Sequence, residues 1–358
     1  MEDDAPADWW LLHVDLDQFL AAVEIRRRPE LAGLPVVVGG DGDPTRPRQV
    51  VATATYEARA LGVHSGMPLR AALRKAPDAV FLPSDHPTYE AASAEVMAVL
   101  RSFGHPVEVW GWDEAFVGAE TDDPHALADA IRARVREETG LTCAVGIGDT
   151  KERAKMATSF GKPGGVFRLD RDTWWQVMGE RPVADLWGIG TKTAARLAEH
   201  GIVTVADLGH ADADALAAWF GPTIGPGLRR LARGGASRTV TTEPWVRRSV
   251  SKQVTYPTDL TTREEITTAV LALLDDVHAL LLAEGRVATH VGVTVRTATF
   301  FTRTKTAKLP EPTTDLAALR ERAEIALARF DVDRPVRLLG VRLDLSEPSP
   351  SPSAASSA

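Results

Sequence analysis

The chain has 358 residues and a formal net charge of −8, with 44% hydrophobic and 25% charged residues. That length exceeds the roughly 250–300 residues that one hydrophobic core usually supports, so we expect a soluble protein of two or more domains. The sequence has no uninterrupted apolar run of about 18 residues and no basic segment followed by an apolar one, which argues against a membrane span and a signal peptide and predicts a cytoplasmic protein. The single cysteine, Cys143, excludes an internal disulfide and is interpreted as a core residue.

The first part of the chain is predicted to alternate strands and helices. Residues 10–16 are expected to form a buried strand, and Asp17 is placed to cap the helix that follows. The order strand, helix, hairpin, helix, strand predicts an α/β layer with helices on one face of the sheet. The other expected segments are the strand "GLPVVVGG", the helix "TYEAASAEVMAVLRSF", the hairpin "VEVWGWDEAFVGAE", the helix "DPHALADAIRARVREETG" and the strand "LTCAVGIG".

The second part of the chain changes character twice. Residues 174–235 show a compact helical pattern, and the segment "SRTVTTEPWVRR" is predicted to be a linker at 237–248. An α+β pattern follows, with a long helix at 262–284 and a strand in which Val291, Val293 and Val295 alternate with polar residues, as in a sheet with one solvated face. The tail "SEPSPSPSAASSA" is rich in Pro, Ser and Ala and is expected to be disordered.

Four acidic residues are the strongest chemical signal. Asp15 and Asp17 lie at the end of the first strand, where burying a carboxylate is costly unless a cation or hydrogen bonds compensate it. Asp113 and Glu114 lie at the expected tip of the hairpin. If that tip lies beside the strand end, Asp15, Asp113 and Glu114 converge, and their repulsion favours two bound Mg²⁺ ions. Each acid alone has an ordinary explanation, as a helix cap or a solvated surface pair.

Two further segments offer groups for the phosphates of a nucleotide. Tyr56 and Arg59 in "TYEAR" share one helical face, where a hydroxyl and a guanidinium can bind phosphate oxygens. Taken alone, they are explained as well by an ordinary helix with a surface arginine. Lys162 in "FGKPGG" lies in a loop between a helix and a strand and can reach the same phosphates, although one lysine is weak evidence.

Two segments suit the backbone of DNA, and the overall negative charge is only weak evidence against such a partner. The segment "GIGTKTAARL" is typical of a helix-hairpin-helix, in which Gly188, Gly190, Thr191 and Lys192 present backbone N–H groups to a phosphate, or else of a tight helix–helix turn. Arg303, Lys305 and Lys308 alternate with threonines in one strand. They suit a track along a phosphate backbone or an edge strand protected by charge.

Several motifs, in this order, resemble those of Y-family translesion DNA polymerases of the DinB, or DNA polymerase IV, branch. The likeness is strong over residues 8–235 and weak beyond. The motifs are "HVDLDQFLAAVE", "VVATATYEAR", "GVHSGMPLRAA", "WDEAF", "VGIGDTKERAKMAT", "GKPGG" and "LWGIGTKTAARL".

The resemblance implies a multidomain α/β (α+β) right-hand polymerase. Its parts are a ferredoxin-like palm at 8–18 and 86–173, small fingers at 19–85, a helix-hairpin-helix thumb at 174–236, the linker at 237–248, a separate α+β little finger at 249–346 and a disordered tail at 347–358. The implied partners are primer-template DNA and deoxynucleotides. The implied cofactors are two Mg²⁺ ions, which Mn²⁺ can replace, and the implied form is a monomer in the cytoplasm, associated with the nucleoid.

The resemblance also assigns roles to single residues. Asp15, Asp113 and Glu114 become catalytic metal ligands, with the Leu16 backbone carbonyl completing one metal shell. Ala52 and Gly66 become the roof over the template base. The implied nucleotide contacts are Phe19, Leu20, Thr53, Tyr56, Arg59 and Lys162, and some relatives place the lysine two residues earlier, where this chain has Phe160. In this assignment Asp17 is a helix cap.

The chain departs from the family pattern in three places. Leu20 stands where the family usually has a Phe or Tyr that excludes ribonucleotides. The chain resembles in this an actinobacterial subgroup that carries leucine at the position and accepts ribonucleotides. Poor sugar discrimination is therefore expected, unless Phe19 or the backbone still excludes the 2′-hydroxyl. Gly111 and Trp112 precede the acidic pair where Ser and a smaller apolar residue are common. The tail lacks a recognisable sliding-clamp peptide, which predicts weak clamp dependence.

Two other functions fit parts of the sequence. One is a catalytically silent DNA-binding accessory protein of the same fold, against which the presence of all three carboxylates argues. The other is a nucleotidyl cyclase, which also uses two aspartates and two metals. A cyclase has no use for the helix-hairpin-helix or for the basic final domain, so the leading hypothesis is a lesion-tolerant polymerase of low fidelity.

Overall fold

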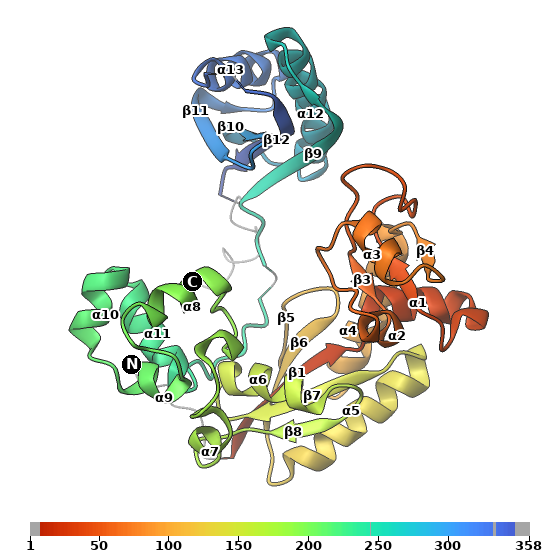
Figure 1. The fold of residues 1–358 in the computed structure, drawn as a ribbon, viewed down its shortest axis with the longest axis vertical. Coiled ribbons are helices and arrows are strands. Elements are labelled where there is room, and N and C mark those ends of the chain that lie inside the picture. The colour runs from red at the N-terminus through yellow and green to blue at the C-terminus, as the bar shows by residue number, and fades with distance from the viewer. Residues whose placement is uncertain (1–7, 244, 332–333, 348–358) are drawn as a thin grey trace, which may run out of the picture. The chain divides into compact units, whose positions relative to one another are not determined.

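The computed structural model describes residues 8–243, 245–331 and 334–347, and the chain divides into two compact units (Figure 1). Unit 1 consists of Met1–Pro44 and Gln49–Glu243, and unit 2 of Thr45–Arg48 and Pro244–Ala358. The expected disordered tail falls, from residue 348 onward, outside the described residues.

A five-stranded sheet, here called the central sheet, forms the middle of unit 1. Its strand order is β5-β6-β1-β7-β8. The middle strand β1 (Trp9–Leu16) runs antiparallel to β6 (Glu114–Glu120) and β7 (Cys143–Gly148), and β5 (Val107–Val109) and β8 (Val166–Arg168) form the edges. The predicted first strand and the β5–β6 hairpin are confirmed.

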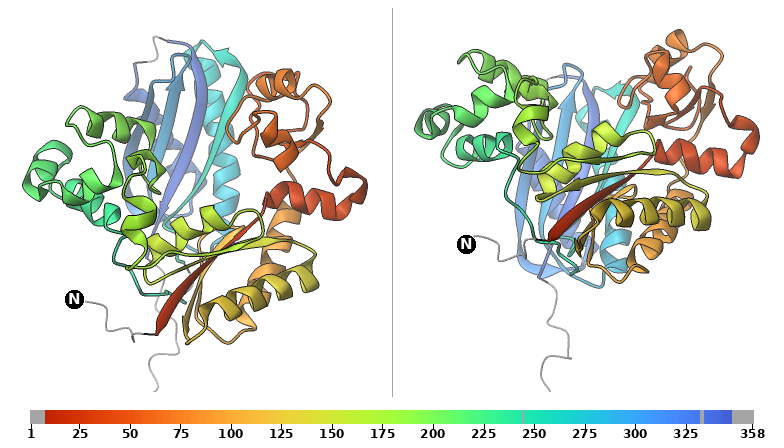
Figure 2. Two further views of the ribbon diagram at one scale, coloured as in Figure 1. Left: turned by 60° about the horizontal axis from the view of Figure 1, so that its bottom comes forward. Right: turned by 90° about the horizontal axis from the view of Figure 1, so that it is seen from below.

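Helices cover both faces of the central sheet, so the expectation of helices on one face only is wrong. The helices α4 (His86–Arg101) and α5 (Pro124–Thr139) pack over Leu12, Val14 and Leu16 of β1. The helix α6 (Lys151–Gly161) crosses the other face, and Figure 2 shows α5 and α6 on opposite sides of the strands. The close approach of α6 depends on glycine in β7, because a Cβ on Gly146 would lie 2.0 Å from the carbonyl oxygen of Ala154.

A smaller layer follows the end of β1. The helix α1 (Phe19–Arg27) continues directly from that strand, and the three-stranded sheet has the order β3-β2-β4. Its apolar core includes Val37, Ala54 and Leu69. The elements of this layer, besides α1, are η1 (Pro29–Leu31), β2 (Val36–Val38), β3 (Thr53–Ala54), α2 (Tyr56–Ala60), α3 (Leu69–Lys75) and β4 (Val80–Leu82).

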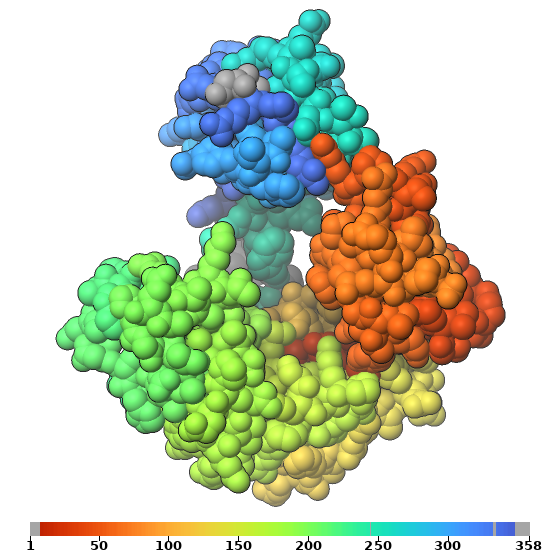
Figure 3. Space-filling view, in the orientation of Figure 1, coloured from red at the N-terminus to blue at the C-terminus, as the bar shows by residue number. Residues whose placement is uncertain are grey.

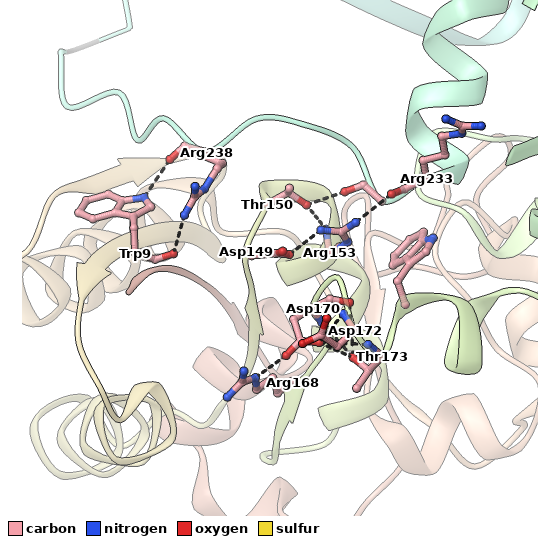
Figure 4. A network of polar contacts seen from close by, with 12 residues as sticks. Trp9, Asp149, Thr150, Arg153, Arg168, Asp170, Asp172, Thr173, Arg233 and Arg238 are labelled. Carbon is pink, nitrogen blue, oxygen red and sulfur yellow. Dashed lines mark hydrogen bonds and ion pairs between the residues drawn. The ribbon is translucent and has the colours of Figure 1, made fainter. Parts of the chain in front are cut away.

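A helical cluster closes unit 1 and is joined to α6 through Arg153 (Figure 4). The Arg153 guanidinium donates to Asp149 at 2.7 Å and to the Arg233 carbonyl at 3.0 Å. The Trp174 indole donates to the Ala232 carbonyl at 2.8 Å. The cluster consists of α7 (Trp174–Met178), η2 (Val183–Asp185), α8 (Thr191–Ala198), α9 (Val205–His210), α10 (Ala213–Phe220) and α11 (Ile224–Ala232).

The first half of the expected linker is attached to the central sheet. The Trp9 indole donates to the Arg238 carbonyl at 3.0 Å, and Glu108 accepts from the Thr241 amide at 2.6 Å. Val240 packs against the small apolar cluster that α6 covers. On the side of unit 2, the Arg247 carbonyl accepts from Arg286 at 2.5 Å. Of the described residues of the linker, only those between 241 and 247 lack such a contact.

Unit 2 is a four-stranded antiparallel sheet, of order β11-β10-β12-β9, with two helices on one face. The predicted alternation is confirmed, since Val291, Val293 and Val295 of β10 are buried toward the helices. The elements are β9 (Ser249–Leu260), α12 (Arg263–Ala283), β10 (Ala288–Thr297), β11 (Thr302–Thr313), α13 (Leu316–Ala328) and β12 (Val336–Leu345).

The helix α12 is long and apolar enough to cross a membrane by length and composition alone. Its apolar residues Ile266 and Leu274 are fully buried in the core of unit 2. Its acidic residues Asp275 and Asp276 form ion pairs with Arg320 and Lys252, each at 2.8 Å. We therefore interpret α12 as the core helix of this unit.

Replacing Gly146 by alanine tests the close packing of α6 on β7. The new Cβ would overlap the Ala154 and Thr158 backbone, so we expect the free energy of unfolding to fall by about 3 kcal/mol or more. Urea unfolding followed by tryptophan fluorescence measures unit 1, which holds every tryptophan except Trp245. In the control Gly227→Ala, where no atom lies within 4 Å of the new Cβ, stability should rise by about 0.5–1 kcal/mol. Equal stability of Gly146→Ala and wild type contradicts this account.

Limited chymotrypsin digestion tests the two-unit division. Trp245 is 78% exposed and lies between the two attached parts of the linker, so the first cut should fall after Trp245 and leave residues 1–245 and 246–358. The variant Trp245→Ala should lose that cut while keeping the same fold. A first cut inside either unit disproves the division.

Candidate active site

The three acids that the sequence singles out meet at the end of β1. The register of the central sheet pairs Asp15 directly with Glu114, and the Leu16 amide donates to the Asp113 carbonyl at 2.8 Å. The turn between β5 and β6 is closed by the Trp110 and Gly111 amides, which donate to the Glu114 carbonyl. The hairpin therefore brings Asp113 and Glu114 beside Asp15, as the sequence predicts. In Figure 3 the early, red part of the chain lies at the floor of a hollow in unit 1, between orange and green segments.

Two lysines of the α6 region face these carboxylates. Lys162 forms an ion pair with Asp15, and Lys155 forms one with Glu114. They line a cavity of about 190 Å³ together with Asp15 and with Trp187 of the helical cluster. Sequence analysis missed Lys155, which lies within α6, whereas Lys162 directly follows the last residue of that helix.

A buried histidine supports Glu114. His13 precedes Asp15 by two residues on β1, is fully buried, and lies with its Nε2 3.2 Å from Glu114. Burial lowers the pKa of His13, so the ring is neutral at pH 7 and this contact is a hydrogen bond. The hydrogen bond with His13, and then Lys155, lower the pKa of Glu114 to about 2 against the opposing effect of burial. Glu114 is therefore an anion throughout the physiological range.

Asp113 has the opposite electrostatic environment. Burial, followed by repulsion from Asp15, raises the pKa of the Asp113 carboxyl. In the part of the chain that the structure describes, no group of three or more His, Cys, Asp or Glu side chains is arranged as a metal site. The oxygen donors present, namely Asp15, Asp113, Glu114 and the Leu16 carbonyl, nevertheless fit a hard divalent cation such as Mg²⁺. Such a cation would relieve the repulsion at Asp113 and displace the lysines from the carboxylates.

Asp17 does not cap a helix, and the expectation that it does is wrong. Residue Gln18 occupies the cap position of α1, with φ 42° and no side-chain capping bond. The Asp17 amide donates to the Thr142 carbonyl at 2.9 Å, and its side chain turns inward, where it is 3% exposed. Its carboxylate accepts from the Tyr56 hydroxyl at 2.8 Å. The left-handed turn at Gln18 aims Asp17 away from the first amides of α1.

The expected nucleotide contacts lie around the start of α2. The Arg59 guanidinium donates to the Ala54 carbonyl at 2.9 Å and to the Thr53 hydroxyl at 3.4 Å, and lies 5.2 Å from the centre of the Tyr56 ring. Lys162 forms its ion pair with the Asp15 carboxylate. The structure thus brings Thr53, Tyr56 and Arg59 together and places Lys162 with the acids.

The expected sugar gate and roof have different environments. Phe19 is 3% exposed and packs in the main core, so its side chain does not face a nucleotide, whereas Leu20 lies partly exposed at the edge of that core. Ala52 and Gly66 are exposed and lie close together, because the Gly66 amide donates to the carbonyl of the neighbouring Val51 at 2.8 Å. Leu20 therefore remains the candidate gate.

The residues expected to contact DNA are only partly brought together. Gly188, Gly190, Thr191 and Lys192 are exposed at the start of α8, whose first turn has no side-chain cap. The three basic residues of β11 do not share one face, because their spacing combines odd and even positions. Arg303 and Lys305 pair with the buried Val295 and Val293, whereas Lys308 pairs with His290 on the other face. One track along β11 is therefore wrong.

The matches to known proteins follow the same division. The model of the impB/mucB/samB family matches residues 14–159, and that of its C-terminal domain matches residues 247–354. The chain belongs to this family. The "DNA polymerase IV 2" of Mycobacterium tuberculosis H37Rv is 53% identical over 340 residues, which cover 94% of this chain and 98% of the relative. The "DNA polymerase IV" of Methanoculleus marisnigri is 39% identical over 341 residues, which cover 94% of each chain.

Solved structures agree with this assignment. The "Y-family DNA polymerase chimera Dbh-Dpo4(243-245)-Dbh" has a TM-score of 0.82 at 28% identity, and the "Insertion ternary complex of Dbh DNA polymerase" has 0.63 at 27%. Each match covers 94% of this chain and 98% of the other. The chain is thus a DinB-type member of the Y family, with a mixed α/β architecture.

Proposed function

We propose that this DinB-type enzyme is a template-directed translesion DNA polymerase of low fidelity and short processivity, which adds nucleotides to a primer 3′-hydroxyl by two-metal phosphoryl transfer. The observation that carries the mechanism is the register that sets Asp15 opposite Glu114, with Asp113 in the adjoining turn. We further propose that the enzyme acts as a monomer in the cytoplasm, associated with the nucleoid and without a sliding-clamp peptide.

In this proposal the acids hold the cations and the lysines leave them. Asp15, Asp113, Glu114 and the Leu16 carbonyl would hold two Mg²⁺ ions, which when bound lower the pKa of the 3′-hydroxyl and neutralise the leaving pyrophosphate. Lys162, released from Asp15, is then free to bind a phosphate of the nucleotide. The hydrogen bond with the His13 ring keeps the Glu114 carboxylate oriented. Because these groups lie on a rigid sheet, the enzyme supplies alignment and charge stabilisation.

The small layer after β1 is proposed to hold the incoming nucleotide. Tyr56 and Arg59 at the start of α2, with Thr53, would contact the triphosphate, and Ala52 with Gly66 would form a thin roof that admits a damaged template base. Gly188, Gly190, Thr191 and Lys192 would bind the DNA backbone. Lys308, on the face of β11 that carries no helix, would contact the DNA backbone as well.

The variant Asp113→Asn tests the metal site. It removes one negative ligand but keeps the shape of the side chain, so primer extension should fall on the order of 10³-fold, while primer-template affinity changes little. Gel-based extension and fluorescence anisotropy measure the two effects. The matched control Glu90→Gln, at an exposed position of α4, should keep full activity. No extension by wild type, with DNA binding intact, favours the accessory protein instead.

The variant Leu20→Phe tests the sugar gate. A planar ring at this partly exposed position should block a 2′-hydroxyl, so ribonucleotide incorporation should fall at least about tenfold while deoxynucleotide incorporation stays within about threefold. Single-nucleotide incorporation with each sugar measures the ratio. If wild type already rejects ribonucleotides, the open gate is disproved and the polymerase assignment stands.

A further inference from the structure

Two successive residues at the end of β1 hold a single tyrosine of α2. The Asp17 carboxylate accepts from the Tyr56 hydroxyl at 2.8 Å, and the Gln18 side-chain oxygen accepts from the Tyr56 backbone amide at 2.7 Å. These bonds join residues 38 and 39 positions apart in the chain. They connect the strand that carries Asp15 with the helix that carries Arg59.

Apart from its bond to Tyr56, the Asp17 side chain has no other structural role among the described residues. It is 3% exposed, caps no helix and forms no ion pair, yet a buried carboxylate is costly unless hydrogen bonds satisfy it. Its second oxygen faces the loop that follows Lys162, since a Cβ on Gly164 would lie 3.6 Å from it. Asp17 therefore lies between the two segments that offer groups for phosphates, the start of α2 and the Lys162 loop.

Gln18 is held in a conformation that serves the same contact. Its φ of 42° lies in the left-handed region, which costs a non-glycine residue roughly 1 kcal/mol or more. In this conformation its side chain reaches the amide of Tyr56, the first residue of α2. The first amides of a helix have no partner within the helix, so Gln18 satisfies one of them from the end of a distant strand.

A phenol donates a single hydrogen bond, so the bond to Asp17 determines where the Tyr56 oxygen lies. The ring in turn lies against the Arg59 guanidinium, which is fixed on its other side by Ala54 and Thr53. The Tyr56 ring, the Ala54 carbonyl and the Thr53 hydroxyl therefore hold the guanidinium together. Binding groups that are already in place spare a ligand the cost of ordering them.

We propose that Asp17, through the Tyr56 hydroxyl, and Gln18, through the Tyr56 amide, are positioning residues that fix the Tyr56 ring and, beside it, the Arg59 guanidinium that would bind the nucleotide triphosphate. This inference rests on the proposed polymerase function. It gives Asp17 a role in nucleotide affinity, distinct from the role of Asp15 in the chemical step. The acidic pair of the first strand end thus divides between metal and nucleotide.

Single-turnover incorporation on a primer-template tests the proposal, because it separates the apparent Kd of the nucleotide from the maximal rate. Asp17→Ala should raise the apparent Kd about tenfold and change the maximal rate less than about threefold. Asp17→Asn keeps an oxygen acceptor and should stay within about threefold of wild type. Gln18→Gly removes the acceptor but tolerates the left-handed turn, and should raise the apparent Kd several-fold.

A double-mutant cycle shows whether Asp17 acts through the tyrosine. In the Tyr56→Phe background, Asp17→Ala should raise the apparent Kd less than about twofold further. The chain offers a matched control in Tyr89, whose buried hydroxyl donates to Glu24 at 2.9 Å. Tyr89→Phe also removes a tyrosine–carboxylate bond, and it should lower the unfolding temperature without changing the nucleotide Kd.

Three outcomes overturn the inference. Additive effects of Asp17→Ala and Tyr56→Phe would show that Asp17 does not act through the hydroxyl. A loss of stability in Asp17→Ala with an unchanged nucleotide Kd in Asp17→Ala and Gln18→Gly would show a structural role only. Wild type that incorporates no nucleotide overturns the proposed function and this inference together, whereas active wild type with additive variants overturns the inference alone.

Discussion

Repulsion between carboxylates at the end of β1 is the constraint on which the rest of unit 1 depends. Asp15, Asp113 and Glu114 are brought together by strand register, and a desolvated anion next to another needs a positive partner. In this structure Lys155 of α6 and Lys162, directly after that helix, supply it. They reach the acids only because α6 lies directly on β7, and that approach requires glycine at 146 and 148, where any Cβ would meet the backbone of α6. Two glycines without chemical function thus determine the charge balance of the acidic site.

The helix α6 also binds the helical cluster, so one element both supplies positive charge to the acids and anchors that cluster. Arg153 binds the Arg233 carbonyl, and Thr150 donates to the Gly234 carbonyl at 2.5 Å, while Lys155, on the same helix, binds Glu114. Lys151, at its first residue, binds Glu108 at 2.5 Å, and Glu108 also holds the Thr241 amide. A displacement of α6 would therefore move the acidic site, the helical cluster and the start of the linker at once. This coupling explains why the first half of the linker behaves as part of unit 1.

Structural features that follow from short-range periodicity could be predicted from the sequence. Features that depend on a particular turn or on the direction of a side chain were missed. The strand before Asp15, the hairpin at Asp113 and the one-sided sheet of unit 2 follow from alternation and from turn residues, and all are confirmed. The role of Asp17 was mistaken because one left-handed residue, Gln18, redirects its side chain, and no local pattern announces that turn. The split of Arg303 and Lys308 between two faces could have been predicted, since positions of unlike parity on a strand point to opposite sides. The part played by Lys155 could not be predicted, because it depends on how closely α6 packs on the strands.

The stretch Asp15–Gln18 illustrates why the end of a central strand suits a catalytic role. Backbone pairing with neighbouring segments holds Asp15, Leu16 and Asp17, and Gln18 follows in a left-handed turn. The Asp15 carboxylate faces Lys162, the Asp17 carboxylate accepts from the Tyr56 hydroxyl, and the Gln18 side-chain oxygen accepts from the Tyr56 amide. The acids proposed to bind metal and the groups proposed to bind triphosphate are thus joined by one short stretch of backbone, Asp15–Gln18. A nucleotide bound at α2, as proposed, would lie next to the acids, which is the alignment that a reaction with little covalent assistance from the protein requires.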